Sequence, residues 1–366
     1  MYKLIIMTPI KSAARIPYYE ELGRYVDLTI VAERETPTEI LNKFGREVGI
    51  NYKSIVLKSI KMFKYMGLSF GIFKYLKKNK YDLIIVEQYA SPTAVLAILY
   101  MKLFKREYAM NADGGFVKNE KTLKEKLKKF LIKGAKFYLT SGKIGEKYLD
   151  SYCAISNDIE IFPFASLSIK EQPDKLLTLE EKKSLKEKKI GSSDYTFLFV
   201  GQFIYRKGID LILEIISEAS IDANFVLIGG KLSEKFEKFI ELKDLPNVNV
   251  FDFMAKVELL EYYAMADCVL IPTREDIWNF SVIEAYSCGS RVITTTNCGA
   301  GIEVLQPESE LLIDPDNKTA LVNAMKYSMN NPITEKESKK YFELSKKYTS
   351  ESMGKAIFEI ADRRIR

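Results

Sequence analysis

The chain has 366 residues, of which 47% are hydrophobic and 28% are charged, and its formal net charge is +6. This composition is typical of a soluble globular protein and excludes a disordered chain, a collagen and a disulfide-based scaffold. The sequence contains no histidine, which excludes catalytic triads that use imidazole and zinc sites with histidine ligands. At about 100–200 residues per domain, the length predicts two or three domains.

The first half of the chain alternates short runs of β-branched and aromatic residues with longer stretches of helical period. We predict strands at 2–7, 26–31, 83–86 and 137–140. Such an alternation predicts a parallel sheet with helices on both faces. We therefore assign residues 1–170 to a first, Rossmann-like domain.

Positive charge is concentrated in this first half. Over residues 1–170, lysine and arginine exceed aspartate and glutamate by 12, whereas acids are in excess in the remainder. Two segments with interleaved lysines and apolar residues, 53–80 and 121–136, account for most of the excess. At helical spacing they predict amphipathic helices with a basic face, which suits an anionic membrane surface. A solvated lysine face over an ordinary core explains the pattern equally well.

No base-stacking or groove-reading motif accompanies these lysines, so we do not expect nucleic acid as a partner. The longest apolar stretch, 92–101, is much shorter than the roughly 20 residues that a membrane-spanning helix needs. The N-terminal apolar run is too short for a signal peptide. The four cysteines are scattered, with no C-x-x-C pair, as is typical of reduced thiols in the cytoplasm. We expect a cytoplasmic protein, peripheral at most to the inner face of the membrane.

The composition changes at 171–194, where large apolar residues are rare apart from spaced leucines. We predict an interdomain linker with an exposed helix there. A second α/β pattern follows, with strands predicted at 196–201, 224–230, 247–253, 268–273 and 291–296. We assign 195–345 to a second Rossmann-like domain and 346–366 to a C-terminal helix that packs back towards the first domain. Two doubly wound domains predict a central cleft, where ligands usually bind.

The most informative segment is PTREDIWNFSVIEAYSCG, residues 272–289. It places Asp276 in the loop after a strand and Glu284, eight residues later, on the following helix. The N–H groups at the start of this helix, 279–281, would attract a phosphate group. Two carboxylates next to a diphosphate would repel it, so their natural partners are the hydroxyl groups of sugar and ribose rings. The segment therefore predicts a nucleotide-sugar site.

A second motif, GQFIYRKG at 201–208, directly follows the first strand of the second domain. Arg206 and Lys207 lie where this loop meets the next helix. The helix dipole disfavours cations at that end, so the pair favours a binding role over plain surface charge. Such a pair can neutralise a diphosphate leaving group without a metal ion.

The segment 272–293 resembles the acid-x7-Glu signature of glycosyltransferase family 4, the retaining transferases with the GT-B fold. Residues 200–213, VGQFIYRKGIDLIL, resemble the nucleotide-diphosphate loop of the same family. The resemblance covers most of residues 105–330. It implies the α/β GT-B fold, a nucleotide-sugar donor, and a retaining transfer that needs neither a metal ion nor another cofactor. It also implies that the first domain, 1–170, binds the acceptor.

The resemblance also implies two groups of site residues. The catalytic group consists of Arg206, Lys207, Asp276 and Asp113. The donor-binding group consists of Gly201, Gln202, Glu275, Asn279, Phe280, Ser281 and Glu284. In this scheme the cation pair stabilises the departing diphosphate, the first acid of the signature contacts the sugar, and the last acid holds the ribose. The diphosphate itself accepts the proton of the acceptor, so no imidazole base is required.

Three departures from the family pattern leave alternatives open. The first acid is usually glutamate, whereas here it is Asp276, and the adjacent Glu275 could serve instead. Gln202 stands where arginine is common, and Arg206 can supply the missing guanidinium. The first-domain histidine of many members has no counterpart. Asp113, in the equivalent stretch, would then face the cleft, although a plain turn explains its Gly-Gly neighbours equally well.

The expected function is transfer of a sugar to a glycan or glycolipid acceptor, with a lipid-linked saccharide favoured, in the assembly of bacterial capsule, exopolysaccharide or lipopolysaccharide. The alternative is a catalytically inactive GT-B subunit that binds nucleotide-sugars within a polysaccharide-assembly complex. A NAD-type Rossmann protein is disfavoured, because no G-x-G-x-x-G follows any predicted strand.

Overall fold

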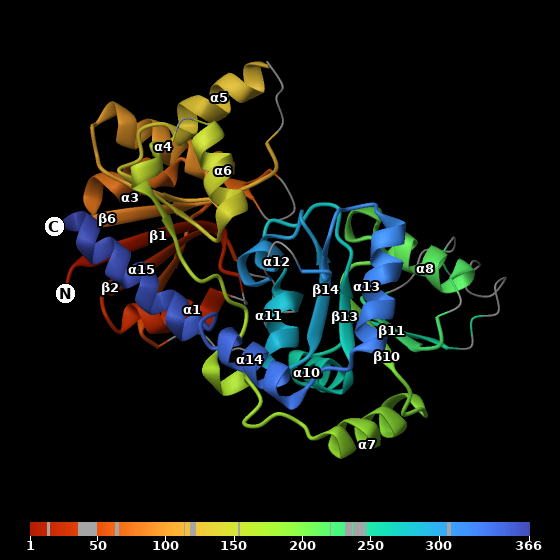
Figure 1. Ribbon diagram of the computed structural model, residues 1–366. Helices are drawn as coiled ribbons and strands as arrows, with labels where there is room; N and C mark the ends of the chain where they lie inside the picture. The colour runs from red at the N-terminus through yellow and green to blue at the C-terminus, as the bar shows by residue number, and fades with distance from the viewer. Residues whose placement is uncertain are drawn as a thin grey trace. The chain divides into compact units, whose positions relative to one another are not determined.

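The computed structural model describes residues 1–12, 15–35, 50–62, 66–112, 114–117, 122–152, 154–219, 221–230, 236, 245, 247–305 and 309–366. The chain divides into two compact units. The first consists of Met1–Ser168 together with Thr349–Arg366, and the second of Ile169–Tyr348. Each unit is a parallel sheet with helices on both faces, as predicted (Figure 1).

The first unit contains a seven-stranded, all-parallel sheet in the order β3-β2-β1-β6-β7-β8-β9. Its strands are β1 (Lys3–Ile10), β2 (Asp27–Arg34), β3 (Tyr52–Val56), β6 (Leu83–Glu87), β7 (Ala109–Asn111), β8 (Phe137–Thr140) and β9 (Ile159–Ile161). A separate antiparallel pair is formed by β4 (Ile60–Lys61) and β5 (Gly67–Leu68). The central strands are buried along almost their whole length, because helices cover both faces of the sheet.

Helices of the first unit form two layers (Figure 1). One layer packs on the face that carries Ile5 and Met7, and it consists of α3 (Gly71–Lys78), α4 (Pro92–Leu103), α5 (Leu123–Ile132) and α6 (Lys143–Ser151). The other contains α1 (Ile16–Gly23) and the C-terminal α15 (Ser350–Ile365), which pack against each other. Segments far apart in the sequence thus share one core. A short 3-10 helix, η2 (Ser156–Asp158), precedes β9.

The second unit contains a six-stranded parallel sheet in the order β12-β11-β10-β13-β14-β15. Its strands are β10 (Thr196–Val200), β11 (Asn224–Ile228), β12 (Val248–Phe251), β13 (Cys268–Ile271), β14 (Arg291–Thr295) and β15 (Leu312–Ile313). This is the order of a doubly wound nucleotide-binding sheet, in which the direction of winding reverses between the first and fourth strands.

Two helical layers also cover this second sheet (Figure 1). On one face, α8 (Ile209–Glu218) and α13 (Lys318–Asn330) share a core with β10 and β11. On the other lie α10 (Lys256–Met265), α11 (Phe280–Ser287) and α12 (Gly299–Val304). Outside them, α7 (Leu179–Ile190) packs on α10, and α14 (Glu335–Ser345) packs on α11. Two 3-10 helices, η3 (Ile169–Glu171) and η4 (Tyr205–Lys207), complete the unit.

The prediction of a basic helix across 53–80 is wrong for its first part. Residues Tyr52–Val56 form the edge strand β3, and Ile60–Lys61 form β4. Only the last part is helical, in α3. Tyr52 is the one buried residue of β3. The strand therefore lacks the alternation of apolar and polar residues by which a strand is normally predicted from a sequence.

The segment 171–194, expected to be a linker with an exposed helix, lies wholly within the second unit. Its helix α7 is fastened to that unit by two lysines. The ammonium group of Lys186 pairs with Asp267, and that of Lys189 pairs with Glu261 at 2.6 Å. The chain leaves the first unit after Ser168 and returns to it at Thr349, so α15 belongs to the first unit.

Candidate functional site

The two sequence motifs meet at the switch point of the second sheet. Strands β10 and β13 are adjacent and parallel, with Phe197 opposite Cys268 and Leu198 opposite Val269. The loops that leave their carboxyl ends, 201–208 and 272–279, therefore start side by side. In doubly wound sheets, this reversal of strand order is where ligands bind.

Gly208 allows the two loops to touch through their backbones. Its φ of 77° lies in the left-handed region, and an added Cβ would lie 2.1 Å from the carbonyl oxygen of Pro272. Next to this contact, the backbone N–H of Arg274 donates to the carbonyl of Arg206 at 2.9 Å. The hydroxyl of Thr273 donates to the same carbonyl at 3.1 Å. The cation-bearing loop is thus fixed to the end of β13.

Arg274 fastens the same two loops through its side chain. Its guanidinium donates two hydrogen bonds to Asp210, each 2.8 Å long, and a third to the carbonyl of Tyr205. It also stacks on the Tyr205 ring, 3.6 Å from the centroid, and donates to Asp316 at 2.5 Å. Bidentate pairing with a carboxylate fixes the orientation of the guanidinium as well as its distance from the carboxylate. No role for this arginine was predicted from the sequence.

The structure brings Lys207 and Asp276 together. The Lys207 ammonium group pairs with Oδ2 of Asp276, and the two side chains are 18% and 13% exposed. Arg206 is exposed, and its guanidinium donates to the carbonyl of Glu275 at 2.7 Å. The side chain of Glu275 is itself exposed. Of the two neighbouring acids, Asp276 is thus the one whose carboxylate meets the lysine.

The helix that follows begins with a strained residue. Asn279 has a φ of 65°, a region that asparagine tolerates better than most residues. Its side-chain oxygen accepts a hydrogen bond from the backbone N–H of Ser281 at 3.0 Å, so it caps α11. The Ser281 hydroxyl lies 3.5 Å from the carbonyl of Val200 at the end of β10, and Phe280 is half-buried. The start of α11 therefore lies next to the first motif.

Gly201 and Gln202 also lie at this edge of the sheet. The N–H of Gly201 donates to the carbonyl of Ile228 at 2.9 Å, and Gln202 is exposed. Glu284 lies deeper, on the second turn of α11. It is 3% exposed, and Oε1 of its carboxylate pairs with Lys256. This lysine was not predicted from the sequence either.

Asp113, which was expected to face the cleft, lies outside the residues that the structure describes, and so does Cys153. The other three cysteines, Cys268, Cys288 and Cys298, are buried, and burial raises the pKa of each thiol to about 12. They therefore stay protonated at neutral pH and are poor nucleophiles. Across the described ranges, no three cysteine or acidic side chains gather closely enough to form a metal site.

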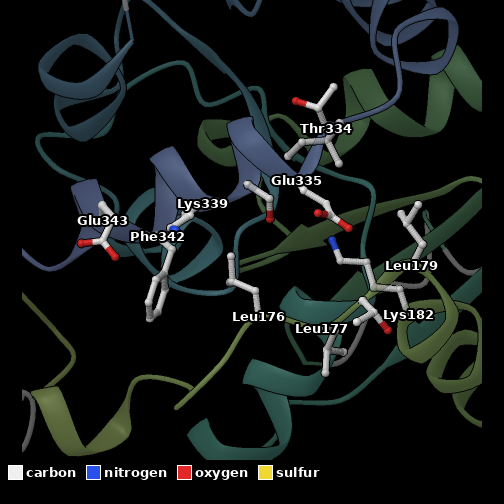
Figure 2. Close-up of a pocket in the computed structure, with 12 residues that line it drawn as sticks. Leu176, Leu177, Leu179, Lys182, Thr334, Glu335, Lys339, Phe342 and Glu343 are labelled. Carbon is white, nitrogen blue, oxygen red and sulfur yellow. The ribbon is translucent and has the colours of Figure 1, made fainter.

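A separate pocket of about 390 Å³ lies between α7 and α14 (Figure 2). Its lining is mostly apolar and consists of Leu176, Leu177, Thr178, Leu179, Lys182, Ile333, Thr334, Glu335, Ser338, Lys339, Phe342 and Glu343. None of the predicted site residues is among them. Burial lowers the pKa of Lys182, whose side chain reaches from α7 towards α14. This pocket is distinct from the switch-point site.

None of the helices within the described part of the chain is both long enough and apolar enough to cross a lipid bilayer.

Residues 180–346 match the family model of the glycosyl transferases group 1. An uncharacterized glycosyltransferase of Methanocaldococcus jannaschii is 25% identical over 340 residues, which is 90% of each chain. An uncharacterized 41.2 kDa protein in the cps region of Klebsiella pneumoniae is 27% identical over 237 residues, covering 61% of this chain and 62% of that one.

Among solved structures, the Anabaena protein HepE in complex with UDP superposes with a TM-score of 0.77 at 12% identity. The match covers 99% of this chain and all of that one. At such low identity the likeness shows the fold. The doubly wound sheets and this superposition agree on the GT-B fold, and within it residues 180–346 are similar to the glycosyl transferases group 1.

Proposed function

We propose that the chain transfers a sugar from a nucleotide-sugar donor to a saccharide acceptor, with retention of configuration and without a metal ion. The observation that carries the proposal is the pair of Lys207 and Asp276 at the switch point, next to Arg206 and the start of α11. Two cations and a helix N-terminus suit a diphosphate, and the acid suits the hydroxyl groups of a sugar.

The chemistry follows from where charge develops. As the bond to the sugar breaks, negative charge grows on the leaving diphosphate. The ammonium group of Lys207 and the guanidinium of Arg206 stabilise that charge, and they are already oriented before the reaction. Asp276 keeps the lysine in place. The acceptor oxygen bonds to the anomeric carbon on the same face that the diphosphate leaves, and a diphosphate oxygen takes the proton of that hydroxyl, so no basic side chain is needed.

Two relatives support parts of this proposal. The structure of HepE contains UDP, which makes a nucleoside diphosphate the natural first probe. The relative from Klebsiella is encoded in the cps region, which supports a role in cell-surface polysaccharide assembly.

The acceptor in this proposal is lipid-linked and lies at an anionic membrane surface. Helix α5 supports it, because Leu123, Leu127 and Phe130 form an exposed apolar stripe at i, i+4 and i+7. The exposed Lys124 and Lys126 flank this stripe. Apolar residues next to lysines are typical of helices that lie on anionic membranes.

The decisive test is the variant Lys207→Ala in an assay of transfer or hydrolysis with a panel of UDP- and GDP-sugars. Loss of one stabilising charge at the leaving group should lower turnover about 100-fold or more. The fold, checked by circular dichroism, should be unchanged. The matched control is Lys189→Ala, which also removes a lysine paired with a carboxylate in the same unit. Near-normal turnover of Lys207→Ala would refute the diphosphate assignment.

The stereochemistry and the absence of a metal are tested on the wild-type protein. Turnover should persist after dialysis against EDTA, and NMR of the product should show the same anomeric configuration as the donor. Loss of activity in EDTA that Mg²⁺ or Mn²⁺ restores would contradict the metal-free mechanism. A protein that binds a nucleotide-sugar but neither hydrolyses nor transfers it would be the inactive binding subunit instead.

A further inference from the structure

Glu284, the acid that the proposed function places on the ribose, has a cationic partner. Oε1 of its carboxylate accepts a hydrogen bond from the ammonium group of Lys256. The Glu284 side chain is 4% exposed and that of Lys256 is 17% exposed. The pair therefore lies largely out of water, where an ion pair is weakly screened and strongly directional.

The position of Lys256 is costly for the helix that carries it. It is the first residue of α10, and a cation at a helix N-terminus opposes the helix dipole. A buried ion pair is also weak evidence for a stabilising role, because desolvation of both charges offsets their attraction. Neither local helix stability nor the pair itself explains why a lysine stands here.

The topology places Lys256 among the donor-site elements. It follows β12, whose carboxyl end lies at the same edge of the sheet as the ends of β10 and β13. Helices α10 and α11 contact each other, so the lysine reaches Glu284 from the neighbouring helix. A carboxylate offers about four lone-pair positions on two oxygens, so Glu284 can accept other hydrogen bonds besides those from Lys256 and from Tyr263, its second polar neighbour on α10.

We propose that Lys256 is a positioning residue of the donor site, which orients the carboxylate of Glu284 so that it accepts hydrogen bonds from the ribose hydroxyls of a nucleoside diphosphate. This inference rests on the proposed function. Lys256 lies outside both sequence motifs. If the inference holds, the preference of the protein for ribose over a deoxygenated ribose depends on this lysine.

The test measures affinity for UDP and for 2′,3′-dideoxy-UDP by isothermal titration calorimetry, with GDP and its dideoxy form as a second pair. Wild-type protein should prefer the ribonucleotide about tenfold or more, since hydrogen bonds to a charged acceptor are strong. Lys256→Met should reduce this preference to near one. Lys256→Arg, which can still donate to Glu284, should restore most of it.

Lys256→Met leaves a buried carboxylate without its cation, which can destabilise the fold. The double variant Lys256→Met/Glu284→Gln removes both charges and keeps the test valid. If the lysine acts through the acid, the double variant should show the same ribose preference as Glu284→Gln alone. Lys189→Met is the control, because it breaks an ion pair with Glu261, which lies on the same helix as Lys256.

Two results would overturn the inference while leaving the proposed function intact. One is an unchanged ribose preference in Lys256→Met. The other is a higher affinity of that variant for UDP, which would show that the lysine competes with the ribose for Glu284. If wild-type protein bound neither UDP nor GDP, the proposed function would fail, and the inference would fail with it.

Discussion

Gly208 is the residue on which the junction of the loops 201–208 and 272–279 depends. Its left-handed backbone costs other residues about 1–2 kcal/mol, and any Cβ would collide with the carbonyl of Pro272. Gly191 offers a matched comparison, because its φ of 67° is similar and a Cβ added there would meet nothing within 4 Å.

We expect Gly191→Ala to lower the free energy of unfolding by about 1–2 kcal/mol, the cost of the backbone conformation alone. Gly208→Ala should cost about 1–3 kcal/mol more, because the loop must also move away from Pro272. It should in addition weaken UDP binding, whereas Gly191→Ala should not. Urea denaturation and calorimetry of both variants measure these effects. Equal losses of stability and unchanged UDP affinity would show that the loop contact has no role.

The sequence could indicate that some residues of the candidate site lie close together, because each belongs to a local motif. Lys207 and Asp276 each lie in a motif with fixed spacing from a strand end. Arg274 lies in the same motif, but its role depends on Asp210 and Asp316, which are 64 and 42 residues away. No spacing rule connects such partners before the fold is known. Lys256 was missed for the same reason, since its partner is on another helix.

At the scale of single elements, α5 exposes a row of large apolar side chains that the core of the first unit does not cover. Leu131 and Ile132 anchor it in the core, while Leu123 is 83%, Leu127 54% and Phe130 52% exposed. Exposed apolar residues in such a row mark an interaction surface more often than chance.

If α5 lies on the membrane, Leu127→Ser/Phe130→Ser should lower binding to vesicles that contain phosphatidylglycerol by about tenfold or more, since each buried apolar side chain contributes about 1.5–3 kcal/mol. Lys124→Gln should lower it about fivefold, at about 1 kcal/mol per lysine near an anionic surface. Vesicle co-sedimentation measures both effects. Val257→Ser is the control, because Val257 is 79% exposed on α10 of the second unit. Binding equal to anionic and neutral vesicles would contradict the proposal.

Strands were predictable from the sequence where both faces are buried over four or more residues, whereas the three-residue β7 was missed. The runs 83–86 and 137–140 correspond to β6 and β8, whose residues are all buried. The edge strand β3 buries a single side chain, and β15 has only two residues. Their backbones pair with neighbours, but their side chains carry no hydrophobic period, so the sequence pattern could not reveal them.

At the scale of the whole molecule, the alternating pattern was enough to predict two doubly wound sheets. The sequence did not show to which of the two units each connecting segment belongs. The segment 171–194 is polar, yet Lys182 and Lys186 on α7 are buried. Long lysine side chains can cover apolar surface with their methylene groups, so α7 has an exposed face, as expected, and packs on the second unit through these two lysines.

The C-terminal helix provides a test of how the two units are divided. Many contacts attach α15 to the rest of the first unit, and three of them show how closely it packs. The ring of Phe358 stacks on that of Tyr25, with centroids 4.9 Å apart. An added Cβ on Gly354 would lie 2.8 Å from the Cβ of Glu21, so α15 lies directly against α1. Near the end of the helix, Arg364 pairs with Glu160 at 2.9 Å.

Removal of residues 349–366 should therefore destabilise the first unit and leave the second unit folded. The truncation would expose the apolar face of α1 that α15 covers, and local opening becomes easier where buried contacts are lost. Hydrogen exchange read by mass spectrometry should show faster exchange in α1 and β2, with α8 and α11 unchanged. Phe358→Ala should give the same pattern more weakly, because it removes the ring contacts with Tyr2 and Tyr25 and keeps the helix. Faster exchange in α8 and α11 to the same extent would mean that the two units unfold as one.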